Sequence, residues 1–149
     1  LDNIEGVVLG YDDNAYKSEW SATERTLYEQ FKETNDPEVF RDVEPVTIAR
    51  VYFYANFLMD ARTAYRMYTT RDEYVAWSEA THMREETITE QEKSRKSALE
   101  NARIMAISNF TQTDEISGTL HLGEGEDMVI FNLILSETGI WQVSFMPMQ

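Results

Sequence analysis

The last third of the chain constrains the fold most, because it consists of successive strand-like runs joined by short turns. Residues 116–122 alternate apolar and polar side chains, which predicts a strand with one buried face. Residues 128–135 are nearly continuously apolar and are predicted to form a central strand covered on both faces. The connection at 137–139 is short and contains Gly139, which is a hairpin signal. Two more strands are expected, at 103–111 and 141–145.

Helical patterns come before these strands. Ser21 and Glu24 have the spacing of a capping box, which predicts a helix from Ser21 to about Thr34. The strongest helix is expected at 45–60, because Pro45 suits a first helical position and apolar residues follow at spacings of three and four. Asp60 is then placed to cap a short second helix through Tyr68.

The middle of the chain is more polar. Thr70 or Asp72 is expected to cap a further helical piece that carries Tyr74, Val75 and Trp77. Residues 84–101 are rich in charge and sparse in apolar positions, which predicts an exposed helix or a partly mobile linker, with a partner-binding arm as an alternative. Near the start, residues 6–10 suit a short strand or an extended arm.

Helices followed by an antiparallel meander indicate an α+β fold, with N-terminal helices packed on a curved antiparallel sheet of about four strands. The length of 149 residues favours one compact domain. Within it we distinguish an N-terminal arm and helix at 1–43 from a main domain at 44–149.

The charge balance limits the classes of partner. The chain has 13 basic and 27 acidic residues and a formal net charge of −14. Such a surface repels phosphate backbones and anionic headgroups, so nucleic-acid binding and direct binding to a membrane surface are not expected. The sequence also has no run of 18 apolar residues, so direct membrane insertion is not expected either. Solubility is the simplest role for this charge, and a basic partner or weak cation binding would also suit it.

No cysteine is present, which excludes disulfides, thiol catalysis and zinc–thiolate sites. The two histidines, His82 and His121, lie 39 positions apart, which is no metal-ligand spacing. We therefore expect neither a metal nor a cofactor. The chain begins at Leu1 and carries no leader-like segment, which slightly favours a mature extracytoplasmic bacterial protein.

The two central helical segments and the last strand resemble nuclear-transport-factor-2-like domains, a superfamily with a cystatin-like fold. The resemblance rests on the run from Pro45 to Tyr54, on Met59 to Thr69 around Asp60, and on a glycine, tryptophan and valine in the last hairpin, at Gly139, Trp141 and Val143. It covers about Glu44 to Met146. In bacterial secreted members of this superfamily the domain often has no known activity.

The resemblance implies a curved sheet wrapped around a long helix, forming a cone with a pocket at its wide end. The charged stretch at 83–101 is longer than the corresponding connection of compact members, which leaves the pocket mouth open, extended or covered. Isomerase-like and cyclase-like relatives use a buried aspartate or histidine base beside tyrosine donors. The pocket candidates that this implies here are Tyr52, Asn56, Tyr65, Trp77, His121 and Asn132.

None of these residues matches a catalytic motif of the family. His82 stands beside acidic residues and is expected on the surface, and His121 is expected as an exposed strand residue. Asn132 is placed in an apolar strand, where a buried amide needs partners, so it marks the pocket or a dimer edge.

Two hypotheses about function follow. The first is a non-catalytic, secreted or envelope-associated domain that binds a small apolar ligand or a protein partner and forms a homodimer through its sheet. The second is an enzyme of the isomerase or cyclase type that uses the cone pocket. We prefer the first because no base-and-donor set can be nominated. A carboxylate or histidine beside a tyrosine in the pocket would favour the second.

Overall fold

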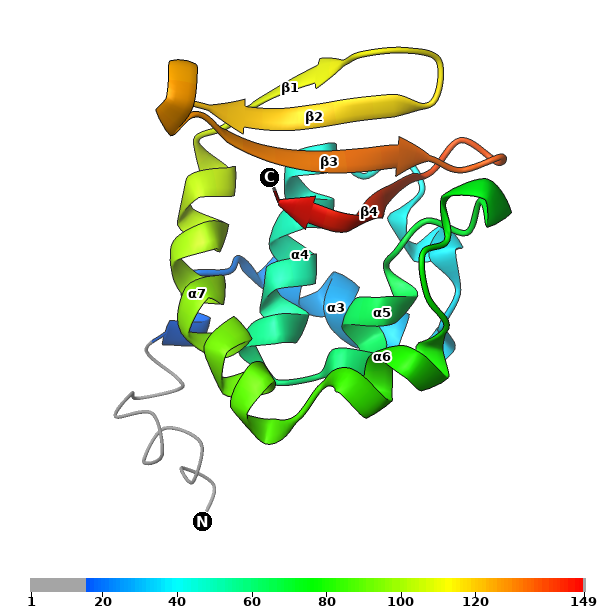
Figure 1. Cartoon of the computed structure of the whole chain (residues 1–149), viewed down its shortest axis with the longest axis vertical. Helices are drawn as coiled ribbons and strands as arrows, with labels where there is room; N and C mark the ends of the chain where they lie inside the picture. The colour runs from blue at the N-terminus through cyan, green and yellow to red at the C-terminus, as the bar shows by residue number, and fades with distance from the viewer. Residues whose placement is uncertain (1–15, 149) are drawn as a thin grey trace.

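Helices pack against one side of a four-stranded antiparallel sheet in the computed structural model, which describes residues 16–148 (Figure 1). The expected α+β class is confirmed. The strand or arm expected at 6–10 lies outside the described residues.

Helix α3 spans Ala22–Thr34 and begins with the predicted capping box. The Ser21 hydroxyl accepts a hydrogen bond from the backbone of Glu24 at 3.1 Å, and the Glu24 carboxylate accepts one from the backbone of Ser21 at 2.8 Å. Asn35 ends the helix in the left-handed conformation, with φ of 54°. The 3₁₀ turn η1, Pro37–Phe40, follows and packs the buried ring of Phe40 on that of Phe31.

Helix α4, Pro45–Phe57, lies in the middle of the molecule, and α7, Ile88–Ala106, packs along it (Figure 1). Helix α4 is buried around most of its circumference, as its apolar sequence predicts. The buried Arg95 of α7 donates a hydrogen bond to the backbone carbonyl of Phe57 at 2.8 Å and lies over the Phe57 ring. Helix α4 ends three residues earlier than predicted.

Residues 84–101 are largely helical, as one of the two alternatives predicted, but the helix is not exposed on all sides. Helix α7 buries one stripe of side chains against α4, formed by Arg95, Ala98, Leu99, Ala102 and Met105. Three of these five are small or charged, so hydrophobic periodicity hides the stripe. The strand predicted from Arg103 is also too long, because α7 continues to Ala106 and strand β1 begins only at Asn109.

Three short helical pieces connect α4 to α7. Asp60 caps α5, Ala61–Arg66, as predicted, by accepting a hydrogen bond from the Thr63 backbone at 3.1 Å. The cap predicted at Thr70 or Asp72 is wrong, because the 3₁₀ turn η2, Asp72–Tyr74, begins after Arg71 without a side-chain cap. Helix α6, Glu79–Glu85, is capped by Ser78 and was not predicted. Its seven residues are too few for a periodic pattern to stand out.

The sheet is a meander in the order β1-β2-β3-β4, with all neighbours antiparallel. Gly139 has φ of 87° in the predicted β3–β4 hairpin, a conformation that favours glycine. A 3₁₀ turn, η3, Gly125–Asp127, lies between β2 and β3. The strands are β1, Asn109–Gln112; β2, Ser117–Leu122; β3, Val129–Leu135; and β4, Trp141–Met148.

The helices cover one face of the sheet (Figure 1). On that face Leu120, Phe131, Leu133 and Val143 are fully buried. The prediction that residues 128–135 are covered on both faces is wrong, because alternate residues of β3 such as Ile130 are only half-buried. On this outer face Ile134 is buried, with 7% exposure, whereas Ile130 and Asn132 are half-buried.

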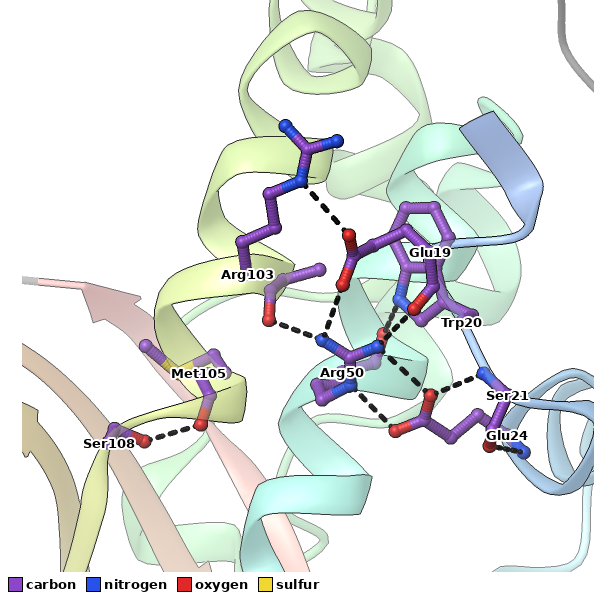
Figure 2. A network of polar contacts seen from close by, with 9 residues as sticks. Glu19, Trp20, Ser21, Glu24, Arg50, Arg103, Met105 and Ser108 are labelled. Atoms are coloured by element: carbon purple, nitrogen blue, oxygen red, sulfur yellow. Dashed lines mark hydrogen bonds and ion pairs between the residues drawn. The ribbon is translucent and has the colours of Figure 1, made fainter. Parts of the chain in front are cut away.

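Arg50 of α4 ties the N-terminal segment into the core (Figure 2). Its guanidinium contacts the carboxylates of Glu24 and Glu19, at 2.7 and 3.3 Å, and donates to the backbone carbonyl of Ala102 on α7 at 2.6 Å. The indole of the fully buried Trp20 donates to the Arg50 carbonyl at 2.7 Å. The described residues before 44 therefore share the core of the main domain.

Candidate functional site

A groove of about 410 Å³ opens between α5, the segment after it and β4. Its floor consists of Tyr68 and Phe145, whose rings stack at 4.4 Å and are 7% and 8% exposed. Val75, at 42% exposure, forms an apolar wall that faces solvent. We call this the aromatic groove and define it by Tyr65, Arg66, Tyr68, Thr70, Val75 and Phe145.

Backbone pairing to the sheet edge holds the groove floor in place. The backbone of Thr69 donates to the carbonyl of Val143 at 2.7 Å, and that of Val143 donates to the carbonyl of Met67 at 3.0 Å. These bonds form a short parallel bridge between Tyr68 and β4. The hydroxyl of Tyr65 donates to the carbonyl of Trp77 at 2.8 Å, which fixes the opposite wall.

The polar groups around the aromatic groove already have partners. The Arg66 guanidinium donates to the carboxylate of Glu79 at 2.8 and 3.3 Å and to the side chain of Asn35 at 2.7 Å. The hydrogen bond to Arg66 lowers the pKa of Glu79, so this pair stays ionised near neutral pH. The backbone and hydroxyl of Thr70 both donate to the Gln142 side chain, at 3.0 and 3.1 Å.

A smaller pocket of about 200 Å³ lies between α4, α7 and the end of β4. It is lined by two of the predicted site residues, Tyr52 and Asn56, together with Ser94, Ser97, Met146 and Met148. The Tyr52 hydroxyl hydrogen-bonds that of Tyr68 at 3.1 Å. This contact joins the wall of the smaller pocket to the floor of the aromatic groove. Burial raises the pKa of both phenols, so both stay protonated.

The other four predicted site residues do not line the smaller pocket. Tyr65 lines the aromatic groove, and the Trp77 ring packs edge-on against Phe145 at 4.9 Å. His121 lies on β2, where it hydrogen-bonds the Thr111 hydroxyl at 2.9 Å. The Asn132 amide donates to the Pro147 carbonyl at 3.3 Å. The structure therefore brings Tyr52 and Asn56 together at one pocket, places Tyr65 at another, and leaves His121 and Asn132 out of the lining of both.

His82 is buried, with 8% exposure, and the prediction that it lies on the surface is wrong. Its Nδ1 accepts a hydrogen bond from the Trp77 indole at 3.1 Å, and its ring lies 5.2 Å from that of Tyr65. Desolvation lowers the pKa of His82, which favours the neutral ring. The acidic neighbours in sequence suggested solvent, but α6 turns this one side chain inward.

Glu86 is the carboxylate nearest to His82, with 3.9 Å between Oε1 and Nε2. Burial, with a contribution from Glu90, raises the pKa of Glu86. Among the described residues, however, no histidine or carboxylate lines the aromatic groove or the smaller pocket. The two cavities are therefore suited to hold an apolar group against aromatic rings. Within the described part of the chain, neither cavity presents a histidine or a carboxylate that could act as a general base.

Within residues 16–148, no group of three or more histidine, aspartate or glutamate side chains is arranged to hold a metal ion. No helix in that range combines the length and the apolar character needed to cross a bilayer.

Four residues of the aromatic groove were not predicted as site residues: Tyr68, Phe145, Val75 and Arg66. Tyr68 and Phe145 are far apart in the chain and read as ordinary core aromatics. The signal that was available is the polar pair Thr69 and Thr70 directly after Tyr68, which indicates that the chain leaves a helix there.

Comparisons with protein-family models, with curated proteins and with solved structures find no match to this chain. The resemblance to nuclear-transport-factor-2-like domains stays a prediction.

Proposed function

We propose that this protein is a non-catalytic binding domain whose aromatic groove accepts the apolar part of a small ligand. The observation that carries the proposal is the stacked pair Tyr68 and Phe145, which floors a cavity of about 410 Å³. Cavities that hold small ligands have volumes of about 300–1,000 Å³ and are lined mostly by apolar and aromatic groups.

The surroundings of the groove support a rigid binding surface. Its two tyrosine hydroxyls are hydrogen-bonded, Tyr65 to the Trp77 carbonyl and Tyr68 to Tyr52. Aromatic rings held in this way present apolar area at little cost in conformational entropy. An entering apolar group would displace water from Val75 and from the half-buried Tyr65, which is favourable at about 25 cal/mol per Å² of apolar surface.

The alternative, an isomerase or cyclase, is less well supported. Such chemistry needs a base within hydrogen-bond reach of the bound substrate. His82 is the nearest imidazole, but its Nδ1 is engaged by Trp77 and the ring is enclosed by aromatic side chains. The predicted extracytoplasmic location and the homodimer through the sheet stay predictions.

Blocking the groove tests the proposal. We choose Val75→Trp, because Val75 is exposed and the larger ring would fill the space above Tyr68. The matched control is Ile88→Trp, which adds the same ring at a position 65% exposed at the start of α7. The probe is 2-phenylethanol, a neutral compound with one aromatic ring, and binding is followed by chemical shifts of Tyr68 and Phe145.

The wild-type protein and Ile88→Trp are expected to bind the probe equally. Binding to Val75→Trp should be at least about tenfold weaker, which corresponds to about 1.4 kcal/mol. If the probe shifts no groove resonance in the wild-type protein, or if Val75→Trp binds as well as the control, the groove is not the binding site.

A further inference from the structure

A second groove, also of about 410 Å³, adjoins the aromatic groove. Pro37 and Thr70 line both. The second groove lies between η1, the segment before η2 and the β3–β4 hairpin, three parts of the chain that are distant in sequence. We call it the acidic groove and define it by the carboxylates that line it, those of Asp36, Glu38, Asp72 and Glu137.

One of the four carboxylates has a cationic partner. The Arg41 guanidinium contacts both oxygens of Glu38 at 2.7 Å, and this interaction lowers the pKa of Glu38. Among residues 16–148, no lysine or arginine forms an ion pair with Asp36, Asp72 or Glu137. Two guanidiniums lie beside the groove: that of Arg41 donates to the carbonyl of Thr138, a lining residue, at 2.9 Å, and that of Arg71 donates to the carbonyl of Leu135 at 2.7 Å. Four carboxylates against these two guanidiniums leave the groove with an excess of negative charge.

In the part of the chain that the structure describes, the lining of the aromatic groove has no unpaired charge. Arg66 is the one charged residue of that part of the chain in its lining, and Glu79 neutralises it through two hydrogen bonds. A ligand long enough to occupy both grooves would therefore contact aromatic surface at one end and negatively charged surface at the other. The change takes place at Pro37 and Thr70.

We infer that the ligand of the aromatic groove is a small amphipathic amine, an aromatic or aliphatic body that carries a protonated amino group. This inference rests on the proposed function, because the apolar body occupies the aromatic groove defined above. The ammonium lies toward the acidic groove, where Asp36, Asp72 and Glu137 attract it. The overall charge of −14 raises the local concentration of such cations and disfavours anionic competitors.

Three compounds of similar size and shape but different charge test whether the charge of the ligand determines its affinity. 2-Phenylethylamine carries a positive charge, 2-phenylethanol is neutral, and 3-phenylpropionate carries a negative charge at neutral pH. Binding to the full chain is measured by chemical-shift titration at low ionic strength. The amine is expected to bind about five- to tenfold more tightly than the alcohol, a modest preference because interactions between exposed charges are weak in water. The carboxylate should bind most weakly.

A charge variant localises the effect. In the triple variant Asp36→Asn, Asp72→Asn and Glu137→Gln the three side chains keep their size, and all three are exposed, so the fold should tolerate the changes. The Asp36→Asn change retains a side-chain oxygen that can accept the hydrogen bond from the Glu38 backbone. A matched control neutralises three exposed carboxylates elsewhere, through Glu90→Gln, Glu100→Gln and Glu115→Gln.

The triple variant is expected to bind the amine and the alcohol equally, with the alcohol affinity unchanged, while the control keeps the preference for the amine. Added salt should reduce the preference in the wild-type protein, because exposed charges are screened. If the amine and the alcohol bind wild-type protein equally, or if the triple variant keeps the preference, the inference is wrong although the proposed function stands. If none of the three compounds binds, the proposed function itself fails.

Discussion

The Arg50 Nε and the Glu24 carboxylate lie 2.7 Å apart in the interior, where each residue is less than 10% exposed. This pair connects α4 to α3 (Figure 2). Three further oxygens complete the guanidinium shell, namely a carboxylate oxygen and the backbone carbonyl of Glu19 and the backbone carbonyl of Ala102. The buried charge therefore has partners in the segment before α3, in α3 and in α7. Such a pair is costly to break from one side.

We expect Arg50→Met to lower the free energy of unfolding by about 3–5 kcal/mol, because Glu24 would remain buried without its cation. The double variant Arg50→Met with Glu24→Gln should recover part of this loss, since a neutral amide is cheaper to bury. Urea denaturation of the two single variants and the double variant measures the coupling. If the losses simply add, the ion pair contributes nothing specific.

Trp20 and Trp141 differ in burial, so their alanine variants compare how much each ring contributes to stability. Trp20 is fully buried, lies 5.1 Å from the Tyr54 ring, and donates its indole hydrogen to Arg50. Trp141 is half-buried and packs edge-on against Phe110. Trp20→Ala should therefore cost about 3–5 kcal/mol. Trp141→Ala should cost clearly less, about 1–3 kcal/mol, because part of its surface is already in water.

Thermal or chemical denaturation of the two variants tests this order. An equal loss from Trp20→Ala and Trp141→Ala would show that exposure does not distinguish them.

Gly118 lies directly under the ring of Phe110, which reaches across from the neighbouring strand. A methyl group at position 118 would overlap the ring, so Gly118→Ala should destabilise the protein by about 1–3 kcal/mol. Removing the ring in Phe110→Ala should abolish the penalty, so the double variant should be no less stable than Phe110→Ala alone. The four denaturation curves form a double-mutant cycle. An undiminished penalty in the Phe110→Ala background would place the strain elsewhere.

His82 is expected to make stability depend on pH. Its pKa in the folded protein lies below the ordinary value of about 6.5, because burial disfavours the charged ring. The unfolded chain therefore binds the proton first as the pH falls. The stabilising contribution is complete above about pH 6.5 and is lost as the pH falls toward the folded pKa. The pKa of Glu86 is raised above its ordinary value of about 4.5, so Glu86 contributes with the opposite sign and stabilises the fold as the pH falls through its raised pKa.

Denaturation midpoints between pH 8 and pH 5 measure this dependence. The variant His82→Gln removes the titrating ring and keeps an oxygen that can accept the Trp77 hydrogen bond, so its midpoint should fall less on acidification. His121→Gln is the control, because it removes the other histidine of the chain. An unchanged slope in His82→Gln would assign the pH dependence to other groups.

The parts of the fold that the sequence predicted are those with strong local signals. The capping box of Ser21 and Glu24, the Asp60 cap and the Gly139 hairpin depend on neighbours within about four residues, so their geometry is readable in the sequence. The order of helices and strands follows from the same local patterns.

The candidate site was predicted only in part. Of the predicted pocket residues, Tyr52 and Asn56 line the smaller pocket and Tyr65 lines the aromatic groove. Tyr68 and Phe145 are 77 positions apart, and nothing in the sequence indicates that their rings stack.

The sequence by itself determined the α+β class, the antiparallel meander and most helix starts, because hydrogen bonds within a few residues and alternating hydrophobicity specify them. Only the tertiary structure decided that α7 packs on α4, that His82 points inward, and that an aromatic groove adjoins an acidic one. These features depend on which surfaces meet when distant segments bury their apolar area. That burial is not directional, so no local pattern records it.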